Sequence, residues 1–387
     1  MNKKNYFNII DLGSSRVRLS VFDNKLSNIF SESKNLNFNK DEIDNFNNIQ
    51  NLIKKAEKKI SSHLDNIILL VDSNKLLNIQ LSIQKSTDIN TNVGIIYKSI
   101  LMELNQLIKS NYLEYDIIHT ILDSCIIDNV KHDELPKNIN KIKNLKINFT
   151  IICFPRKNIE LLRKNFNKYN IQILSTFCTS FTKTLSYLNK LNHNKLSFLD
   201  IGWERTSIII YENYKLRFID TIPIGGFHIT KDISKIFKID LDEAENIKKS
   251  FNKSENEFSY KNEEKLNQIS AVEIFNKNIS VDLLKKVILY RVQEIIDLSL
   301  NKLHLKKLQI NLKNTDLFLI GGGSILFKNN SFYLKDKSEF NSINYYVEQD
   351  AEICKSGLTY YLNNSVMLEK SKKKQGLFEK FFNFFGR

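Results

Sequence analysis

A strand–turn–strand pattern with an acidic residue before the turn occurs twice in this 387-residue chain. The first copy, YFNIIDLGSSRVRLSVFD, ends its first strand at Asp11 and turns at Gly13. The second copy, LSFLDIGWERTSIIIY, ends its first strand at Asp200 and turns at Gly202. Apolar and polar residues alternate along the first copy, which is typical of a half-buried strand. Because the two aspartates lie about half a chain length apart, the sequence predicts two related lobes that present acidic hairpins to a shared cleft.

Both turns carry groups that can bind phosphate. Backbone N–H groups and hydroxyls in a tight turn can cradle phosphate oxygens, and a nearby aspartate can hold magnesium through water. A single hairpin of this kind is better explained as a plain structural turn, but the repeat favours a nucleotide site. We predict that Asp11 and Asp200 serve a magnesium ion. The predicted phosphate contacts are Gly13, Ser14, Ser15, Arg16 and Gly202; Arg205 could also contact phosphate, and Thr206 is a further predicted nucleotide-binding residue.

Three later segments complete the predicted site. The pair Gly225-Gly226 follows a third strand, and an apolar strand runs into the sequence GGGS at residues 321–324. Glycines at a strand end let a flat ligand approach the backbone. Glu245 and Lys248 lie one helical turn apart, where they could grip a ribose or base or form only an exposed ion pair. The predicted nucleoside contacts are Glu245, Lys248, Gly321, Gly322, Gly323 and Ser324, and Gly225 and Gly226 are further predicted nucleotide-binding residues.

The C-terminal segment GLFEKFFNFFGR has the pattern of an interfacial membrane helix. On a helix its large apolar residues share one side, and the basic run at residues 370–374 precedes them. Lysines beside an anionic membrane surface strengthen such attachment. The alternative is a helix that docks back onto its own domain. The predicted membrane contacts are Leu377, Phe378, Lys380, Phe381, Phe382, Phe384 and Phe385.

The composition excludes several other classes of protein. The net charge is +14, but outside residues 370–374 the basic residues form no block interleaved with aromatics, so we expect no nucleic-acid partner. The four cysteines are far apart and predict neither a disulfide nor a metal site. The short apolar run before Asp11 is not typical of a secretory signal, and no stretch is long and apolar enough to span a bilayer. We therefore expect a cytosolic protein attached to a membrane surface.

On these segments the chain resembles the FtsA family of bacterial cell-division proteins, within the superfamily of actin and heat-shock-chaperone ATPases. IDLGSSRVR and LDIGWERTSIIIY are similar to the two phosphate loops of that family. EAENIKKSF and LIGGGSIL resemble its nucleoside-binding elements, and IPIGGFHITKDIS and DAEICKSGLTYYL resemble further family segments. The resemblance implies a two-lobed actin-like α/β fold with an inserted subdomain in the first lobe and a C-terminal amphipathic helix.

The resemblance also implies a division of the chain. The first lobe would comprise residues 1–82 and 156–192, and an inserted interaction subdomain would occupy residues 83–155. The second lobe would comprise the remaining folded segments: residues 193–240 and 310–364, with a small subdomain at residues 241–309. A polar linker at residues 365–375 would lead to the membrane-targeting helix at residues 376–387.

As a member of this family the chain would bind ATP with magnesium and tether filaments of the tubulin-like FtsZ to the cytoplasmic face of the cell membrane at the division site. The family implies four partners: the FtsZ C-terminal tail, further copies of the chain in a filament, an anionic membrane and later division proteins. Trp203, Glu204 and Arg205 stand where the second loop of the family carries Gly-Gly-Thr. We therefore expect weak or absent ATP hydrolysis and assign no catalytic residue. The alternatives are an actin-fold kinase or ATPase and a pilus-assembly scaffold.

Overall fold

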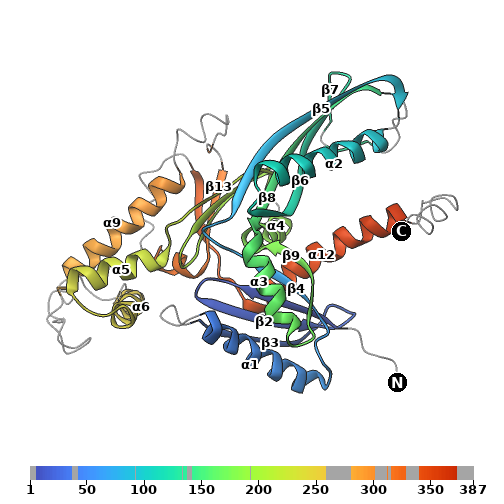
Figure 1. Ribbon diagram of the computed structural model, residues 1–387. Helices are drawn as coiled ribbons and strands as arrows, with labels where there is room; N and C mark the ends of the chain where they lie inside the picture. Colours follow the sequence, from blue (N-terminus) through green and yellow to red (C-terminus); the bar gives the residue numbers. More distant parts are fainter. Residues whose placement is uncertain are drawn as a thin grey trace.

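The computed structural model describes residues 6–36, 42–91, 93–132, 134–136, 142–191, 193–258, 280–300, 312, 315–327 and 340–372. Within these ranges the chain forms two five-stranded sheets and one four-stranded sheet, with helices packed on their faces (Figure 1).

The sheet of the first lobe has the strand order β3-β2-β1-β4-β9. Its strands are β1 Phe7–Leu12, β2 Arg16–Phe22, β3 Asn28–Asn35, β4 Asn66–Val71 and β9 Gln172–Cys178. Strands β1 to β3 are antiparallel neighbours, whereas β1, β4 and β9 run parallel. One apolar core joins this sheet to α1 (Glu42–Ile60) and α3 (Arg156–Asn167). The other face packs against α12 (Asp350–Lys372).

The sheet of the second lobe repeats this arrangement with the order β12-β11-β10-β13-β14. Its strands are β10 Lys195–Ile201, β11 Thr206–Glu212, β12 Lys215–Ile222, β13 Thr315–Ile320 and β14 Phe340–Tyr345. Again the first three strands are antiparallel and the other two are parallel to the first. Its faces carry α4 (Thr179–Leu191), α5 (Gly226–Phe237), α6 (Leu241–Phe258) and α9 (Val281–Ser299). The predicted two-lobed α/β repeat is thereby confirmed.

The insertion between β4 and β9 forms a separate layer that projects from the first lobe at the top of Figure 1. Its sheet has the order β5-β8-β6-β7, with β5 Leu77–Thr91, β6 Tyr115–Ile127, β7 Val130–His132 and β8 Ile142–Pro155. Helix α2 (Val93–Asn111) buries the residues Ile96, Ile100, Leu104 and Ile108 against the sheet at helical spacing. The insert begins with β5, a few residues before the predicted boundary at residue 83.

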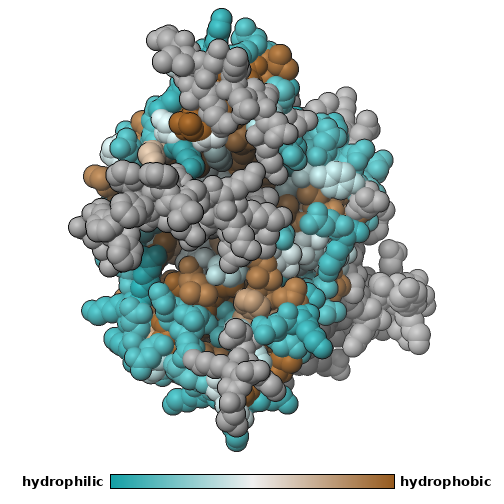
Figure 2. All heavy atoms as spheres, turned by 90° about the vertical axis from the view of Figure 1, so that its right-hand side faces the viewer, coloured by the Kyte–Doolittle hydropathy of each residue, from teal (hydrophilic) through white to brown (hydrophobic). Residues whose placement is uncertain are grey.

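The last described helix continues beyond the predicted end of the second lobe. Helix α12 runs to Lys372, into the segment that was expected to be a linker. The predicted membrane helix at residues 376–387 lies outside the described residues. No helix in the described ranges combines the length and the apolar character needed to cross a membrane. Figure 2 shows that apolar atoms on one face gather in a band below the centre, bordered by polar atoms.

Candidate functional site

The two predicted hairpins have the same backbone turn. In the first, the Gly13 N–H donates to the carbonyl oxygen of Arg16 at 3.0 Å. In the second, the Gly202 N–H donates to the carbonyl oxygen of Arg205 at 2.8 Å. A side chain at either glycine would press on that carbonyl, since an added Cβ would lie 3.0 and 3.1 Å from it. The two lobes therefore present equivalent turns.

A cleft of about 950 Å³ lies between these turns. Its volume is in the range of small-molecule sites, which are concave and few per protein. The structure brings most of the predicted residues to its walls. The predicted residues that line it are Asp11, Gly13, Ser14, Ser15, Arg16, Asp200, Gly202, Arg205, Gly226, Glu245, Lys248, Gly321, Gly322 and Gly323.

The glycine segment after β13 enters the cleft closely beside Asp200. Gly321 has a φ of +87°, and a Cβ added there would lie 2.5 Å from a carboxylate oxygen of Asp200, so both backbone and space require glycine. At Gly322, by contrast, an added Cβ meets no heavy atom within 4 Å. Gly322 thus faces the open part of the cleft, which fits the predicted contact with a flat ligand.

The other three predicted residues support the walls rather than line them. The Thr206 hydroxyl donates to the Ile224 carbonyl oxygen at 2.7 Å, and the Ser324 hydroxyl donates to the Gly321 carbonyl oxygen at 2.6 Å. Gly225 packs so closely on the second turn that an added Cβ would lie 2.6 Å from the Gly202 carbonyl oxygen. Thr206 and Gly225 therefore support the second hairpin, and Ser324 supports the glycine segment after β13.

Glu245 and Lys248 line the cleft but are buried and paired with each other at 2.6 Å. The Lys248 ammonium also donates to the Gly226 carbonyl oxygen at 2.9 Å and to the Thr230 hydroxyl at 2.8 Å. Burial lowers the pKa of Lys248, while Glu245 opposes that shift. The pair fastens α6 to the start of α5, so it differs from the exposed ion pair that was the alternative.

Trp203 forms part of the cleft wall on the second hairpin. Its ring stacks on Phe227 with the centroids 5.1 Å apart and the planes 23° apart. The Lys248 ammonium lies 4.8 Å from the centre of the indole ring, a cation–π distance. The bulky residue that replaces glycine in the second loop is therefore packed between two side chains of its own lobe.

The Asp11 carboxylate is buried and already bound by donors. Its Oδ1 accepts from the Thr179 hydroxyl at 2.7 Å, and its Oδ2 accepts from the Arg18 guanidinium at 2.7 Å. Arg18 lies opposite Asp11 in the β1–β2 register and also reaches Asp350 at 2.6 Å. Burial alone would lower the pKa of Arg18, but Asp11 and Asp350 raise it above the usual value.

The Asp200 carboxylate is bound by two cations. Its Oδ1 accepts from the Lys183 ammonium at 2.8 Å, and its Oδ2 accepts from Arg205 at 3.2 Å. Lys183 also pairs with Glu348 at 2.9 Å. Burial by itself lowers the pKa of Lys183, but attraction to Asp200 and Glu348 and hydrogen bonds to both raise it above that of an ordinary lysine.

Arg205 joins the two lobes. Its side chain is only 5% exposed, and its guanidinium pairs with Asp72, the residue after β4 of the first lobe, as well as with Asp200. It also donates to the Ser207 hydroxyl at 2.5 Å. Burial lowers the pKa of Arg205 to about 10, which still leaves it charged at neutral pH. In this structure the guanidinium, which was predicted to contact phosphate, is directed at the carboxylates of Asp72 and Asp200.

Sequence reasoning missed four charged residues of this network that line the cleft: Arg18, Asp72, Lys183 and Glu348. Asp72 carried a usable pattern, because NIILLVD is a third apolar strand that ends at an aspartate. Lys183 is the only charged residue in the segment TSFTKTLSYL, which is largely buried, and a buried lysine implies a carboxylate partner. Glu348 follows β14 and has no comparable local pattern.

The predicted magnesium role of Asp11 and Asp200 can be tested against this geometry. All four of their carboxylate oxygens accept from a hydroxyl, an ammonium or a guanidinium. In the described part of the chain, no group of three His, Cys, Asp or Glu side chains is placed to hold a metal ion. The volume of the cleft suits a nucleotide. The carboxylates of Asp11 and Asp200 suit a divalent ion poorly, because their oxygens already accept hydrogen bonds from the chain.

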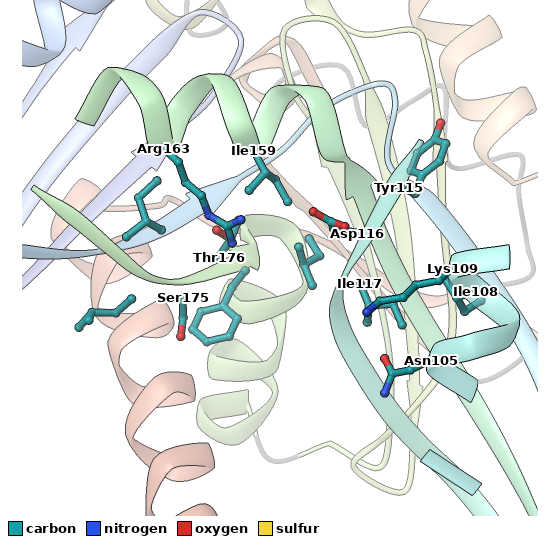
Figure 3. Close-up of a pocket in the computed structure, with 14 residues that line it drawn as sticks. Asn105, Ile108, Lys109, Tyr115, Asp116, Ile117, Ile159, Arg163, Ser175 and Thr176 are labelled. Atoms are coloured by element: carbon teal, nitrogen blue, oxygen red, sulfur yellow. The ribbon is translucent and has the colours of Figure 1, made fainter. Parts of the chain in front are cut away.

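A second, smaller cleft of about 370 Å³ lies between the insert and the first lobe. Helix α3 contributes Ile159 and Arg163 on one side, and α2 contributes Asn105 and Lys109 on the other (Figure 3). Residues of β6 and of the edge strand β9 line the rest. Sequence reasoning did not single out these residues.

Comparisons with known proteins bear on the family. A family model described as cell division protein FtsA matches residues 197–372. The cell division protein FtsA of Buchnera aphidicola subsp. Acyrthosiphon pisum is 26% identical over 363 residues, which cover 86% of this chain and 83% of that protein. FtsA of Bacillus subtilis (strain 168) is 24% identical over 313 residues, which cover 77% and 69% of the two chains.

Other matches are shorter or show the fold alone. FtsA of Streptococcus pneumoniae serotype 2 is 24% identical over 224 residues, so this chain spans about half of that relative, 47% of its length. A solved structure, the PilM-PilN type IV pilus biogenesis complex, has a TM-score of 0.60 at 14% identity and covers 91% of this chain and 90% of that chain. Taken together, the family match over residues 197–372, the FtsA relatives and the shared two-lobed fold show that the chain is similar to the FtsA family of cell-division proteins and has an actin-like fold.

Proposed function

We propose that this chain is a division protein that binds an adenine nucleotide, ATP, in the cleft between its lobes and attaches FtsZ filaments to the membrane. The observation that carries the nucleotide proposal is the convergence of four separate sequence segments on one cleft. Both hairpin turns, the start of α6 and the glycine segment after β13 meet there. When bound, the nucleotide would place its phosphates against the turns and its nucleoside between α6 and Gly322.

The same geometry supports slow or absent hydrolysis. The carboxylates nearest the turns, Asp11, Asp200 and Glu348, are held by Arg18, Lys183 and Arg205. A carboxylate held this way is a poor general base, because taking up a proton would break its ion pair. Nucleotide would therefore act by holding a conformation for assembly rather than as a substrate to be consumed.

Calorimetric titration of the full chain with ATP, in magnesium and in EDTA, tests the nucleotide proposal. Gly322→Glu is the informative variant, because this position has room for a side chain and the carboxylate would enter the cleft. We expect at least about tenfold weaker ATP binding, since the added side chain would occupy the space proposed for the nucleoside and its charge would repel the anionic ligand, with an unchanged melting curve. Ser62→Glu adds the same charge at an exposed position outside the cleft and should bind normally. A folded wild-type chain that binds no ATP in either buffer would disprove the proposal.

Membrane attachment through residues 376–387 is proposed from the sequence pattern and the family. Phe381→Glu places a charge in the apolar side of that helix, and Asn383→Glu places the same charge on its polar side. Co-sedimentation with anionic liposomes should be lost in the first variant and retained in the second. Equal binding by both variants would place the anchor elsewhere.

The remaining partners are proposed from the similarity to FtsA proteins. We propose that the small subdomain with α6 and α9 receives the FtsZ C-terminal tail, and that the insert contacts further copies of the chain in a filament at the septum. Exposed apolar side chains on and after α2, namely Ile95, Met102 and Leu113, support a protein contact on the insert. Met102→Glu should weaken self-association in sedimentation without changing liposome binding.

A further inference from the structure

We propose that the guanidinium of Arg205, held between Asp72 and Asp200, replaces a divalent cation at the junction of the two lobes. The proposal concerns the chain without any ligand, and it does not depend on nucleotide binding. Its starting point is the disagreement between the acidic pair predicted to serve a metal and the cations that the structure places on that pair.

The position of Arg205 is that of a bridging ion. Asp72 directly follows β4, which neighbours the central strand β1 of the first lobe, and Asp200 lies near the end of the central strand β10 of the second lobe. One nitrogen of the guanidinium, Nη2, bonds to carboxylates from both. A metal ion between two lobes would likewise join carboxylates from each side with a positive centre.

The surrounding contacts fix this centre in place. Arg205 Nη1 donates to the Ser207 hydroxyl, which is 2.8 Å from the Thr221 hydroxyl. Asp72 accepts from the Ser180 N–H at 3.1 Å and from the Ser180 hydroxyl at 3.3 Å. Both partners are thus oriented by neighbouring polar groups, which come from β11 and β12 for Arg205 and from α4 for Asp72. A rigid, hydrogen-bonded pair of this kind suits the planar fork of arginine better than the point charge of lysine.

The charge balance explains why one cation is needed there. Asp11, Asp72, Asp200 and Glu348 line the same cleft, and each is largely buried. Buried carboxylates without a counter-charge are strongly unfavourable. Lys183 serves Asp200 and Glu348, and Arg18 serves Asp11, so Arg205 is the cation that Asp72 shares with Asp200. If Arg205 is removed, the two carboxylates would have space and charge for a hydrated divalent ion.

Thermal unfolding of the full chain without nucleotide tests the replacement. Wild type should melt at the same temperature in EDTA and in millimolar magnesium or manganese chloride. Arg205→Ala should melt about 5 °C lower in EDTA and recover at least half of that loss when either metal is added. Sodium chloride at equal ionic strength should not restore it, since screening alone supplies no bridging ion.

Arg217→Ala is the matched control. Arg217 lies on β12 in the same sheet and pairs with Glu212 at the surface, so its loss should change neither the melting temperature nor the response to metal. Stabilisation of wild type by magnesium would overturn the proposal. So would an Arg205→Ala variant that loses no stability or gains none from metal.

A direct measurement covers the case in which Arg205→Ala does not fold. Electron paramagnetic resonance of manganese added to the wild-type chain should show only the free aqueous ion. Bound manganese in wild type that disappears in Asp200→Asn would contradict the replacement of the ion by Arg205.

Discussion

Arg16 and Arg205 occupy the same place in two turns of the same geometry, but their side chains have opposite surroundings. Arg16 is 44% exposed and bonds to Ser33 and Asp350 near the surface. Arg205 is 5% exposed and bonds to Asp72 and Asp200 inside the cleft. The repeated backbone turn therefore sets the position of each arginine. The groups around that position determine whether the side chain is buried between two carboxylates, as in Arg205, or exposed at the surface, as in Arg16.

The largest difference between the turns should appear when each arginine is removed. Arg205→Ala should lower the free energy of unfolding by about 3–5 kcal/mol, because it leaves buried carboxylates without a partner. Arg16→Ala should cost less than about 1 kcal/mol, since an exposed pair is screened by water. Urea unfolding of both variants against wild type measures the difference. Equal losses would mean that burial does not distinguish the two turns.

Exchanging the turn residues between the two hairpins should have an effect of intermediate size on the free energy of unfolding. Changing Trp203 and Glu204 together to serine gives the second turn the sequence of the first and removes the stacking on Phe227. We expect a loss of about 1–3 kcal/mol, from one aromatic pair and the cation–π contact with Lys248.

The reverse exchange is the control for that prediction. Ser14→Trp with Ser15→Glu should cost less than about 1 kcal/mol, because Phe227 and Lys248 belong to the second lobe and cannot pack on the first turn. Urea unfolding of both exchanges is again the measurement. If the first-turn exchange were the more costly, the second turn would not be specialised by its packing.

Both hairpins could be predicted from sequence because each is local. A strand, an aspartate, a glycine turn and a second strand are contiguous in the chain, so periodicity and turn chemistry identify them. The glycine segment after β13 was predicted for the same reason. Thr206, Gly225 and Ser324 also lie beside the turns, but a linear pattern does not distinguish a residue that lines a cleft from one that supports its wall.

The ion network could not be predicted, because its partners are distant in the chain. Arg205 pairs with Asp72 across 133 positions, and Lys183 meets Glu348 across 165. Such pairs depend on how the two sheets face each other, and this is a property of the whole fold. The sequence therefore predicted an acidic cleft with a metal, whereas the chain itself supplies the cations.

The smallest predicted effect is on the pH dependence of stability. The first hairpin should lose stability at acid pH, and the second should lose it at alkaline pH. Near the first hairpin, burial alone would raise the pKa of Asp350, but hydrogen bonds from Arg18 and Ser33 and attraction to Arg18 and Arg16 lower it overall. A carboxyl with a lowered folded-state pKa stabilises the fold above the unfolded value of about 3.9 and loses that contribution as pH falls further. The first hairpin should therefore be sensitive on the acid side.

Near the second hairpin, the raised pKa of Lys183 acts at the other end of the scale. A lysine with a raised folded-state pKa stabilises the fold fully below the unfolded value of about 10.4 and loses that contribution as pH rises above it. Asp350→Asn should flatten the loss of stability below about pH 4, and Lys183→Gln should flatten it above about pH 10, each by at most about 1.4 kcal/mol per pH unit. Urea unfolding of the two variants and wild type across both ranges measures these slopes. An Asp350→Asn chain that flattens the alkaline limb, or a Lys183→Gln chain that flattens the acid limb, would show that the two hairpins do not titrate as separate units.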